Sequence, residues 1–246
     1  MTYCLAIKLE AGIVYCSDTR TTAGIDQVSA YSKMHDFSIE NDRHIMLLSA
    51  GNLATSQAVI SKLQTDIESN AVLNLHNAYS SHDVANYVAL SLREEVSKFN
   101  SSNHEASMIL GVQLANETRP QIMLIYPQGN FITTSNDTPF LQIGESKYGK
   151  PILDRVVEQT TTLSIAAAAA IVSMDSTIRS NVSVGAPIEL CIYKASSFAR
   201  CFYSKFTEDS AFLRDFQSSW DTGIKKAFNN LPPVEWSEVW ETKTTN

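Results

Sequence analysis

The first two dozen residues constrain the fold more than any other part of the chain. Residues 2–9 and 12–19 alternate between apolar and polar side chains, are rich in β-branched and aromatic residues, and are separated by a short turn that contains glycine. This pattern predicts a β-hairpin whose second strand ends at Asp18. When Met1 is removed, as expected where a small residue follows it, Thr2 heads the first strand. An amine, a hydroxyl and a carboxylate then lie at one end of one sheet.

The spacing of apolar residues divides the rest of the chain into blocks of strands and helices. A loop over residues 21–34 leads to a second predicted hairpin over 35–41 and 44–50. From Leu53 the apolar spacing changes to three or four residues, which predicts two helices before the strands return. Further strands are predicted at 107–115, 121–126, 130–134, 139–143, 187–194 and 198–204, and further helices at 147–158, 163–178 and 208–229.

The order of these blocks predicts the fold class. It fits an α+β architecture in which two antiparallel sheets pack face to face with helices on both outer sides, a four-layer αββα sandwich. A chain of 246 residues with 44% apolar residues can bury one sizeable core, and no composition shift marks a linker. We therefore expect a single domain over residues 1–246, with a C-terminal helix and an extended tail from about residue 205. Trp236 and Trp240 in that tail are expected to form a subunit contact.

Charge and hydropathy argue against several classes of partner. The net charge of −7 and the pI near 5.2 argue against a nucleic-acid partner. No apolar stretch reaches the roughly 20 residues needed to span a bilayer, and no secretion signal precedes the first strand. We therefore expect a cytoplasmic protein without a membrane or nucleic-acid partner.

The cysteines and histidines show no metal-binding pattern. The cysteines fall in apolar, strand-like stretches without a CxxC motif, so we expect buried free thiols in a reducing compartment. They are Cys4, Cys16, Cys191 and Cys201. The five histidines lack HxH and HExxH spacing and are expected at the surface or in helix caps. We expect no metal and no cofactor; without a nucleotide motif, energy-dependent unfolding of substrates would require a separate partner.

Four positions in the first half match the chemistry of an N-terminal nucleophile. The hydroxyl of Thr2 needs a base, and the α-amine of the chain, with a pKa of about 7.7 to 8.0, can take its proton. Lys33 would supply a fixed positive charge that favours the alkoxide-like form, and Asp18 would hold Lys33. Gly51 stands between a predicted strand and a predicted helix, where a backbone N–H can face a developing oxyanion.

These residues resemble the catalytic β subunits of the proteasome and their bacterial HslV relatives. The resemblance covers roughly residues 2–204. It is carried by Thr2, residues 17–24, Lys33, residues 49–51, 143–154 and 180–190. Within this superfamily, two segments are most similar to the bacterial proteasome-type proteases called Anbu. Their sequences are Asp-Thr-Arg-Thr-Thr-Ala-Gly and Ser-Ala-Gly-Asn-Leu-Ala-Thr. The helix and tail past residue 205 also agree with Anbu.

The resemblance implies an N-terminal nucleophile hydrolase that acts on peptides or proteins and assembles into a homo-oligomeric ring or open helical ring. By this resemblance Thr2 is the nucleophile, Asp18 and Lys33 tune it, and the Gly51 amide serves the oxyanion. Supporting positions implied in the same way are Arg20, Ser146, Ser180 and Ser183. Proteasome β subunits carry an aspartate at the place that Ser180 occupies here, which is a departure from the family pattern.

Arg20 and Thr22 have two interpretations. They can be ordinary polar residues of a turn and loop, or they can lie on a loop whose backbone pairs with an extended substrate. In the second interpretation Thr22 belongs to the substrate-binding surface.

Three classes of function remain open at this stage. The first is a threonine peptidase or amide hydrolase in an oligomer, and the second is a proteasome-like scaffold with a weak or vestigial site. Noncatalytic family members usually lack the threonine and lysine that stand here as Thr2 and Lys33, which argues against the scaffold. The third is an N-terminal nucleophile amidase for small amides or isopeptides. Removal of Met1 matters to all three, because a retained Met1 turns the Thr2 amine into an amide.

Overall fold

The computed structural model describes residues 2–22, 28–99, 102–199 and 201–232. They fall into two compact units, Met1–Glu208 and Asp209–Asn246. The second unit contains helix α5 (Ala211–Asn229), which Ser210 caps by accepting a hydrogen bond from the N–H of Leu213. The predicted tail contact of Trp236 and Trp240 lies outside the described residues. None of the helices in the described ranges combines the length and apolarity needed to cross a membrane.

The predicted N-terminal hairpin is present and forms the middle of the first sheet, called sheet 1 here. Strand β1 (Tyr3–Leu9) pairs antiparallel with β2 (Gly12–Asp18), and the sheet order is β10-β1-β2-β11-β12. Its other strands are β10 (Phe140–Gly144), β11 (Ile188–Lys194) and β12 (Phe202–Phe206). At the hairpin turn Gly12 has φ 147°, and a Cβ there would lie 1.9 Å from the carbonyl oxygen of Tyr193. Only glycine fits that position.

The second sheet, called sheet 2 here, has the order β5-β6-β7-β8-β9. Its strands are β5 (Met34–Asp36), β6 (Arg43–Gly51), β7 (Ala106–Leu114), β8 (Gln121–Ile125) and β9 (Phe131–Thr133). The strand predicted over 35–41 was too long: Asp36 accepts a hydrogen bond from the N–H of Ser38 at 2.9 Å, and this turn ends β5. The predicted loop over 21–34 holds most of a short ribbon formed by β3 (Arg20–Thr22) and β4 (Val28–Ala30).

The last strand of sheet 1 also begins later than predicted. Residues 194–198 form a turn in which the N–H of Ser197 donates to the carbonyl of Lys194 at 3.1 Å. Ser196 and Phe198 both have positive φ there, at 56° and 42°, which an extended strand cannot accommodate. Strand β12 therefore starts at Phe202 instead of residue 198.

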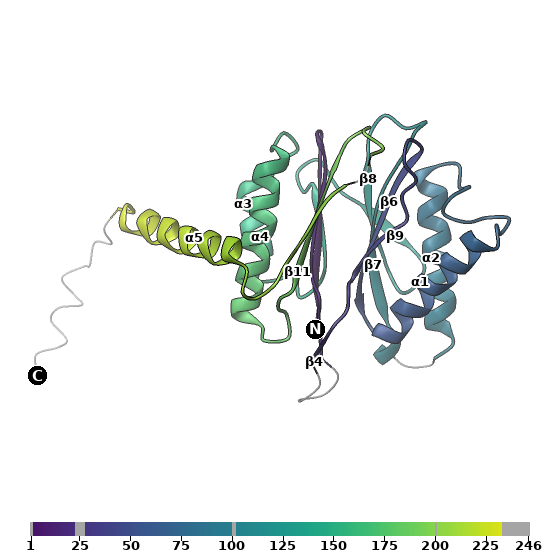
Figure 1. Ribbon diagram of the computed structural model, residues 1–246, viewed down its shortest axis with the longest axis horizontal. Helices are drawn as coiled ribbons and strands as arrows, with labels where there is room; N and C mark the ends of the chain where they lie inside the picture. Colours follow the sequence, from purple (N-terminus) through teal and green to yellow (C-terminus); the bar gives the residue numbers. More distant parts are fainter. Residues whose placement is uncertain (1, 23–27, 100–101, 200, 233–246) are drawn as a thin grey trace, which may run out of the picture. The chain divides into compact units, whose positions relative to one another are not determined.

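The helices of the first unit cover the outer faces of both sheets. They are α1 (Leu53–Glu68), α2 (Ser81–Ser97), α3 (Lys150–Val156) and α4 (Leu163–Ser180), together with a 3-10 turn at Ser102–His104. Figure 1 shows the layers in order: α3 and α4, sheet 1, sheet 2, then α1 and α2. Ala166 and Ala170 of α4 are fully buried, and their small side chains let this helix lie close to sheet 1.

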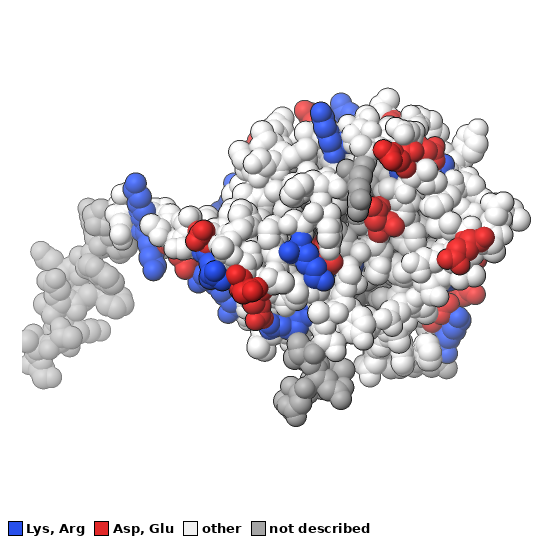
Figure 2. Space-filling model, in the orientation of Figure 1, with Lys and Arg blue, Asp and Glu red and all other residues white. Residues whose placement is uncertain are grey.

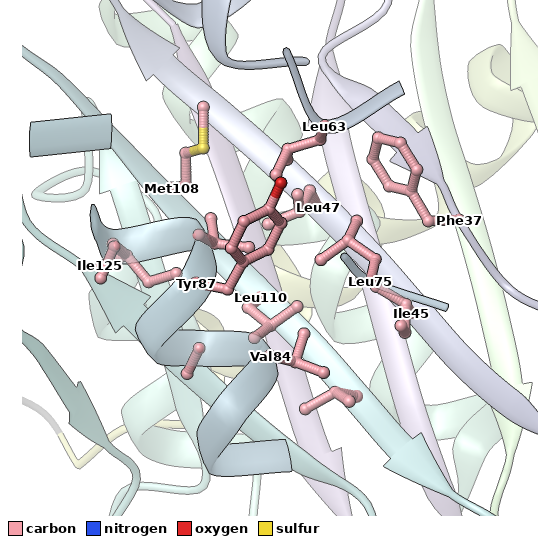
Figure 3. Close-up of a cluster of buried hydrophobic side chains, with 14 of the residues drawn as sticks. Phe37, Ile45, Leu47, Leu63, Leu75, Val84, Tyr87, Met108, Leu110 and Ile125 are labelled. Carbon is pink, nitrogen blue, oxygen red and sulfur yellow. The ribbon is translucent and has the colours of Figure 1, made fainter. Parts of the chain in front are cut away.

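Among the described residues, one apolar cluster packs helices α1 and α2 on sheet 2, and another packs the two sheets together. The first lies between sheet 2 and helices α1 and α2; Leu47 and Leu110 of the sheet, together with Leu63 and Val84 of the helices, are among its side chains in Figure 3. The second lies between the two sheets and includes Cys4, Ile13, Met46, Leu48 and Ile109. On the face of the molecule shown in Figure 2, acidic and basic side chains are interspersed.

Polar side chains of both sheets are also buried, which the apolar pattern of the strands did not predict. Asp18 and Glu189 come from sheet 1 and His44 from sheet 2, and each is at most 1% exposed. The expectation that His44 lies at the surface or in a cap was wrong. Its ring stacks on Tyr193, with centroids 3.8 Å apart, and bonds to the hydroxyl of Tyr15, so two partners from sheet 1 compensate its burial.

All four cysteines are free. The expected burial is observed for Cys4, Cys16 and Cys191, whereas Cys201 is only partly buried. Cys201 lies just before β12, outside the paired strand residues.

Candidate active site

Backbone contacts on two sides hold Thr2 at the end of sheet 1. The carbonyl oxygen of Thr2 accepts a hydrogen bond from the N–H of Glu145 at 2.7 Å, just after β10. The next residue, Tyr3, donates its N–H to Oδ1 of Asp18 at 3.0 Å, at the end of β2. Gly144 has φ 80°, and a Cβ there would lie 1.9 Å from the Thr2 carbonyl oxygen. The partly buried Thr2 is therefore fixed between the ends of β2 and β10.

A buried ion pair lies beside this end of the sheet. Nζ of Lys33 is 2.6 Å from Oδ1 of Asp18, and the two residues are 5% and 0% exposed. Nζ also donates to the carbonyl of Arg20 at 2.7 Å. The carbonyl of Lys33 accepts from the N–H of Ser49 on β6 at 3.0 Å. The backbone of Lys33 is thus attached to sheet 2 while its side chain reaches sheet 1.

Opposing effects act on the carboxyl of Asp18. Burial raises its pKa above the ordinary value, because the charged form loses its hydration. The Lys33 ammonium lowers the pKa, as do the hydrogen bonds from Lys33 and from the N–H groups of Tyr3 and Gly185, and burial prevails. The carboxylate and the ammonium therefore depend on each other, since either charge alone would be buried without a partner.

Gly51 borders a cavity that also reaches the neighbourhood of Thr2. It is the last residue of β6, it has φ 108°, and a Cβ there would lie 2.5 Å from the carbonyl oxygen of Glu105. Asn52 follows and caps α1 by accepting a hydrogen bond from the N–H of Thr55 at 3.0 Å. The cavity has a volume of about 200 Å³, and its lining includes Gly51 and Gly144. Gly144 is the residue whose backbone abuts the Thr2 carbonyl.

Arg20 fixes the loop after α4 against this site. Its guanidinium donates to the carbonyl of Val182 at 3.1 Å and to the carboxylate of Glu208 at 2.8 Å. A Cβ at Gly185 would lie 2.2 Å from the Arg20 guanidinium carbon, so the loop passes directly against this side chain. The N–H of Gly185 faces Oδ2 of Asp18 at 3.4 Å. Arg20 thereby connects the loop to the buried ion pair.

The predicted serines lie on two segments around the site. Ser146 follows β10, where its N–H donates to the carbonyl of Gly144 at 3.1 Å. Ser180 is the exposed last residue of α4. Ser183 is partly buried on the loop that Arg20 holds, and its N–H donates to Oδ1 of Asn181 at 3.0 Å. The backbone of Thr22 pairs with Val28 in the β3–β4 ribbon.

Two buried carboxylates that the sequence analysis missed lie near these residues. Glu145 is 8% exposed and accepts a hydrogen bond from the side-chain amide of Asn181 at 2.8 Å, joining the two serine segments. Glu189 is 1% exposed and accepts from the hydroxyls of Ser32 at 3.0 Å and Tyr203 at 2.6 Å. A glutamate inside an otherwise apolar strand was the available signal for Glu189.

The chain is similar to proteins of one family. The proteasome subunit family model matches residues 2–193. Anbu (ancestral beta-subunit) from Yersinia bercovieri is 39% identical with a TM-score of 0.92, over 96% of this chain and 100% of that one. Anbu from Hyphomicrobium sp. strain MC1 is 38% identical with a TM-score of 0.88, over 95% and 100%.

A third structure, described as the helical assembly of the Anbu complex from Pseudomonas aeruginosa, is 41% identical with a TM-score of 0.88. The match covers 95% of this chain and 98% of that one. No match was found among curated proteins.

Proposed function

The chain belongs to the proteasome subunit family as an Anbu-type member, and we propose that it is a threonine-type peptidase or amide hydrolase whose nucleophile is Thr2. The observation that carries this proposal is the buried Lys33–Asp18 pair beside the end of sheet 1, where Asp18 also binds the N–H that follows Thr2. A buried cation next to a threonine at a strand end favours the ionised form of its hydroxyl. The family relationship supports a peptidase-type hydrolase.

In the proposed mechanism the α-amine of Thr2, exposed by removal of Met1, takes the proton of the Thr2 hydroxyl. The hydroxyl oxygen attacks the carbonyl carbon of the substrate, and the N–H of Gly51 donates to the oxyanion of the tetrahedral intermediate. The ammonium formed on Thr2 then gives its proton to the leaving amine. Water hydrolyses the resulting ester and restores the threonine.

The remaining predicted residues have supporting roles in this proposal. Arg20 positions the loop that carries Ser183, Ser180 ends the helix before it, and Ser146 fixes the turn beside Thr2. Thr22 belongs to the ribbon whose backbone pairs with an extended substrate. We further assign the layered first unit to the αββα sandwiches of N-terminal nucleophile hydrolases, and treat residues 1–246 as one proteasome-like domain with a C-terminal extension.

We also propose a cytoplasmic homo-oligomer, formed as a ring or open helical ring. The match to the helical assembly from Pseudomonas aeruginosa supports this. The protein would work without a cofactor, and a separate unfoldase would deliver folded substrates.

The test is turnover of fluorogenic peptides by the processed protein and by Thr2→Ala. We expect Thr2→Ala to lose turnover while the circular dichroism spectrum and the assembly size are unchanged. Thr133→Ala, a change of the same size at an exposed position of β9, is the matched control and should retain full activity. Full activity of Thr2→Ala would overturn the proposal. Turnover of γ-glutamyl or acylamino compounds but not of peptides would assign the small-amide hydrolase instead.

A further inference from the structure

A second buried cluster surrounds the ring of His44, away from the residues assigned to Thr2 chemistry. The hydroxyl of Tyr15 lies 2.8 Å from Nε2 of His44. This hydroxyl also lies over Gly111, where a Cβ would come within 1.8 Å of it, so it is enclosed. Burial raises the pKa of Tyr15 well above its ordinary value, which keeps the hydroxyl protonated. A protonated hydroxyl can donate to Nε2, and in that tautomer the ring proton of His44 lies on Nδ1.

Nδ1 of His44 faces two acceptors, the hydroxyl oxygen of Ser38 at 3.2 Å and the sulfur of Cys201 at 3.7 Å. The Ser38 oxygen already accepts a hydrogen bond from the N–H of Ile45 at 3.0 Å. Cys191, on the neighbouring strand β11, lines the same cavity as Cys201. The sulfur of Cys201 thus lies against the imidazole of His44 and shares a cavity with the Cys191 thiol.

This arrangement distinguishes Cys201 from the other cysteines. The neighbouring Cys191 thiol lowers the pKa of Cys201 and His44 lowers it further, whereas burial and the Asp36 carboxylate oppose both effects. The interaction with Cys201, together with burial, raises the pKa of Cys191. Burial is the largest cause that raises the pKa values of Cys4 and Cys16. Cys201 is the sulfur of this cluster that is set up to be a thiolate.

Small molecules have room to reach this sulfur. One cavity, of about 250 Å³, is lined by Cys201 and His44 together with Asp36, Ser38 and Arg43. A second, of about 210 Å³, is lined by both Cys191 and Cys201. Because Cys201 precedes the first paired residue of β12, its backbone is not fixed by the β11–β12 ladder. It can therefore shift toward Cys191 without breaking strand pairing.

We propose that Cys201 is a site of reversible oxidation by hydroperoxides, with His44 holding its thiolate and Cys191 acting as the resolving thiol. The Cys201 thiolate attacks one oxygen of hydrogen peroxide, the O–O bond breaks, and the departing hydroxide takes a proton to become water. Sulfur loses two electrons to the peroxide and becomes sulfenic acid. The Cys191 sulfur then attacks the Cys201 sulfur, the S–O bond breaks, and a second water leaves with the Cys191 proton.

The test is brief treatment of the full-length protein with hydrogen peroxide and intact mass measurement, followed by alkylation of the remaining thiols and peptide mapping. We expect a loss of about 2 Da, with a disulfide between Cys191 and Cys201 that dithiothreitol reverses. Cys201→Ser should not lose this mass, and Cys191→Ser should stop at a sulfenic acid on Cys201 that dimedone traps. Cys16→Ser, at a fully buried position, is the matched control and should behave as the unchanged protein does.

Absence of oxidation at Cys201, or a Cys201 sulfenic acid that persists while Cys191 is present, would overturn the proposal. A second measurement needs no variant: the rate of Cys201 alkylation by iodoacetamide against pH. Its midpoint should lie below the value of about 8.5 of an ordinary thiol, and a midpoint at or above that value would contradict a thiolate held by His44. Both measurements are independent of Thr2 and its turnover.

Discussion

The cluster at Asp18 and the cluster at His44 are both buried and both connect the two sheets, but different interactions hold them. Asp18 and Lys33 form an ion pair at 2.6 Å that connects sheet 1 to sheet 2. Around His44 the connection between the sheets consists of the Tyr15 hydroxyl bond and stacking on Tyr193. Removing one partner leaves a buried charge in the first cluster and a buried acceptor in the second. The first loss should therefore be the larger.

The largest expected effect follows removal of the Lys33 charge. Lys33→Met leaves Asp18 buried without its counterion, so the free energy of unfolding in urea should fall by about 3–5 kcal/mol, and peptide turnover should be lost. Lys150→Met is the matched control, because the Lys150–Asp154 pair has half-exposed side chains. That control should change stability by less than about 1 kcal/mol. A Lys33→Met protein as stable as the unchanged one would remove the distinction between the clusters.

A smaller effect is expected in the second cluster. Tyr15→Phe keeps the ring but leaves Nε2 of His44 without its donor, and should reduce the free energy of unfolding by about 1–3 kcal/mol. Tyr79→Phe removes the hydroxyl of a side chain that is 84% exposed, and should stay within about 0.5 kcal/mol of the unchanged protein. If Tyr15→Phe reduces the free energy of unfolding by more than Lys33→Met does, the His44 cluster contributes more to stability than the Asp18 cluster, which contradicts the expected order.

The smallest effect is a dependence of the Lys33→Met loss on pH. The folded-state pKa of Asp18 is raised above 3.8, so its contribution favours folding below that value and disappears as pH rises through the folded pKa. Without Lys33 the pKa of Asp18 rises further. Each pKa unit of this rise corresponds to about 1.4 kcal/mol of free energy. The stability difference between the two proteins should therefore be smaller at pH 4 than at pH 7. Equal stability differences at pH 4 and pH 7 would mean that protonation of Asp18 does not change the effect of removing Lys33.

The sequence predicted the parts of the fold and site that depend on neighbouring residues. The hairpin of β1 and β2 follows from alternation around Gly12, Asp18 stands out as a charge at the end of an apolar strand, and Lys33 lies at the far end of the loop that follows. The structure places these two charges in contact, and it places Thr2 next to the N–H that binds Asp18.

Partners that are distant in sequence could not be predicted in this way. His44 looked like a surface residue because its stacking partner, Tyr193, belongs to the other sheet. Glu189 gains its hydroxyl partners from Ser17, 172 residues earlier, and from Ser32, 157 residues earlier. Such contacts depend on which strands pair within sheet 1 and on how the two sheets pack, which no local pattern encodes. The early end of β5 was missed for a local reason instead: the Asp36 side chain competes with strand pairing.

The central claim is that Thr2 is an active N-terminal nucleophile. The most direct test is the intact mass of the purified protein before and after incubation with a peptide epoxyketone, which must react with both the hydroxyl and the free amine of an N-terminal threonine. We predict that Met1 is absent and that one inhibitor adds to each chain, with no addition to Thr2→Ala. A retained Met1, or a processed chain that takes no adduct, would contradict the claim and favour a scaffold whose site is inactive.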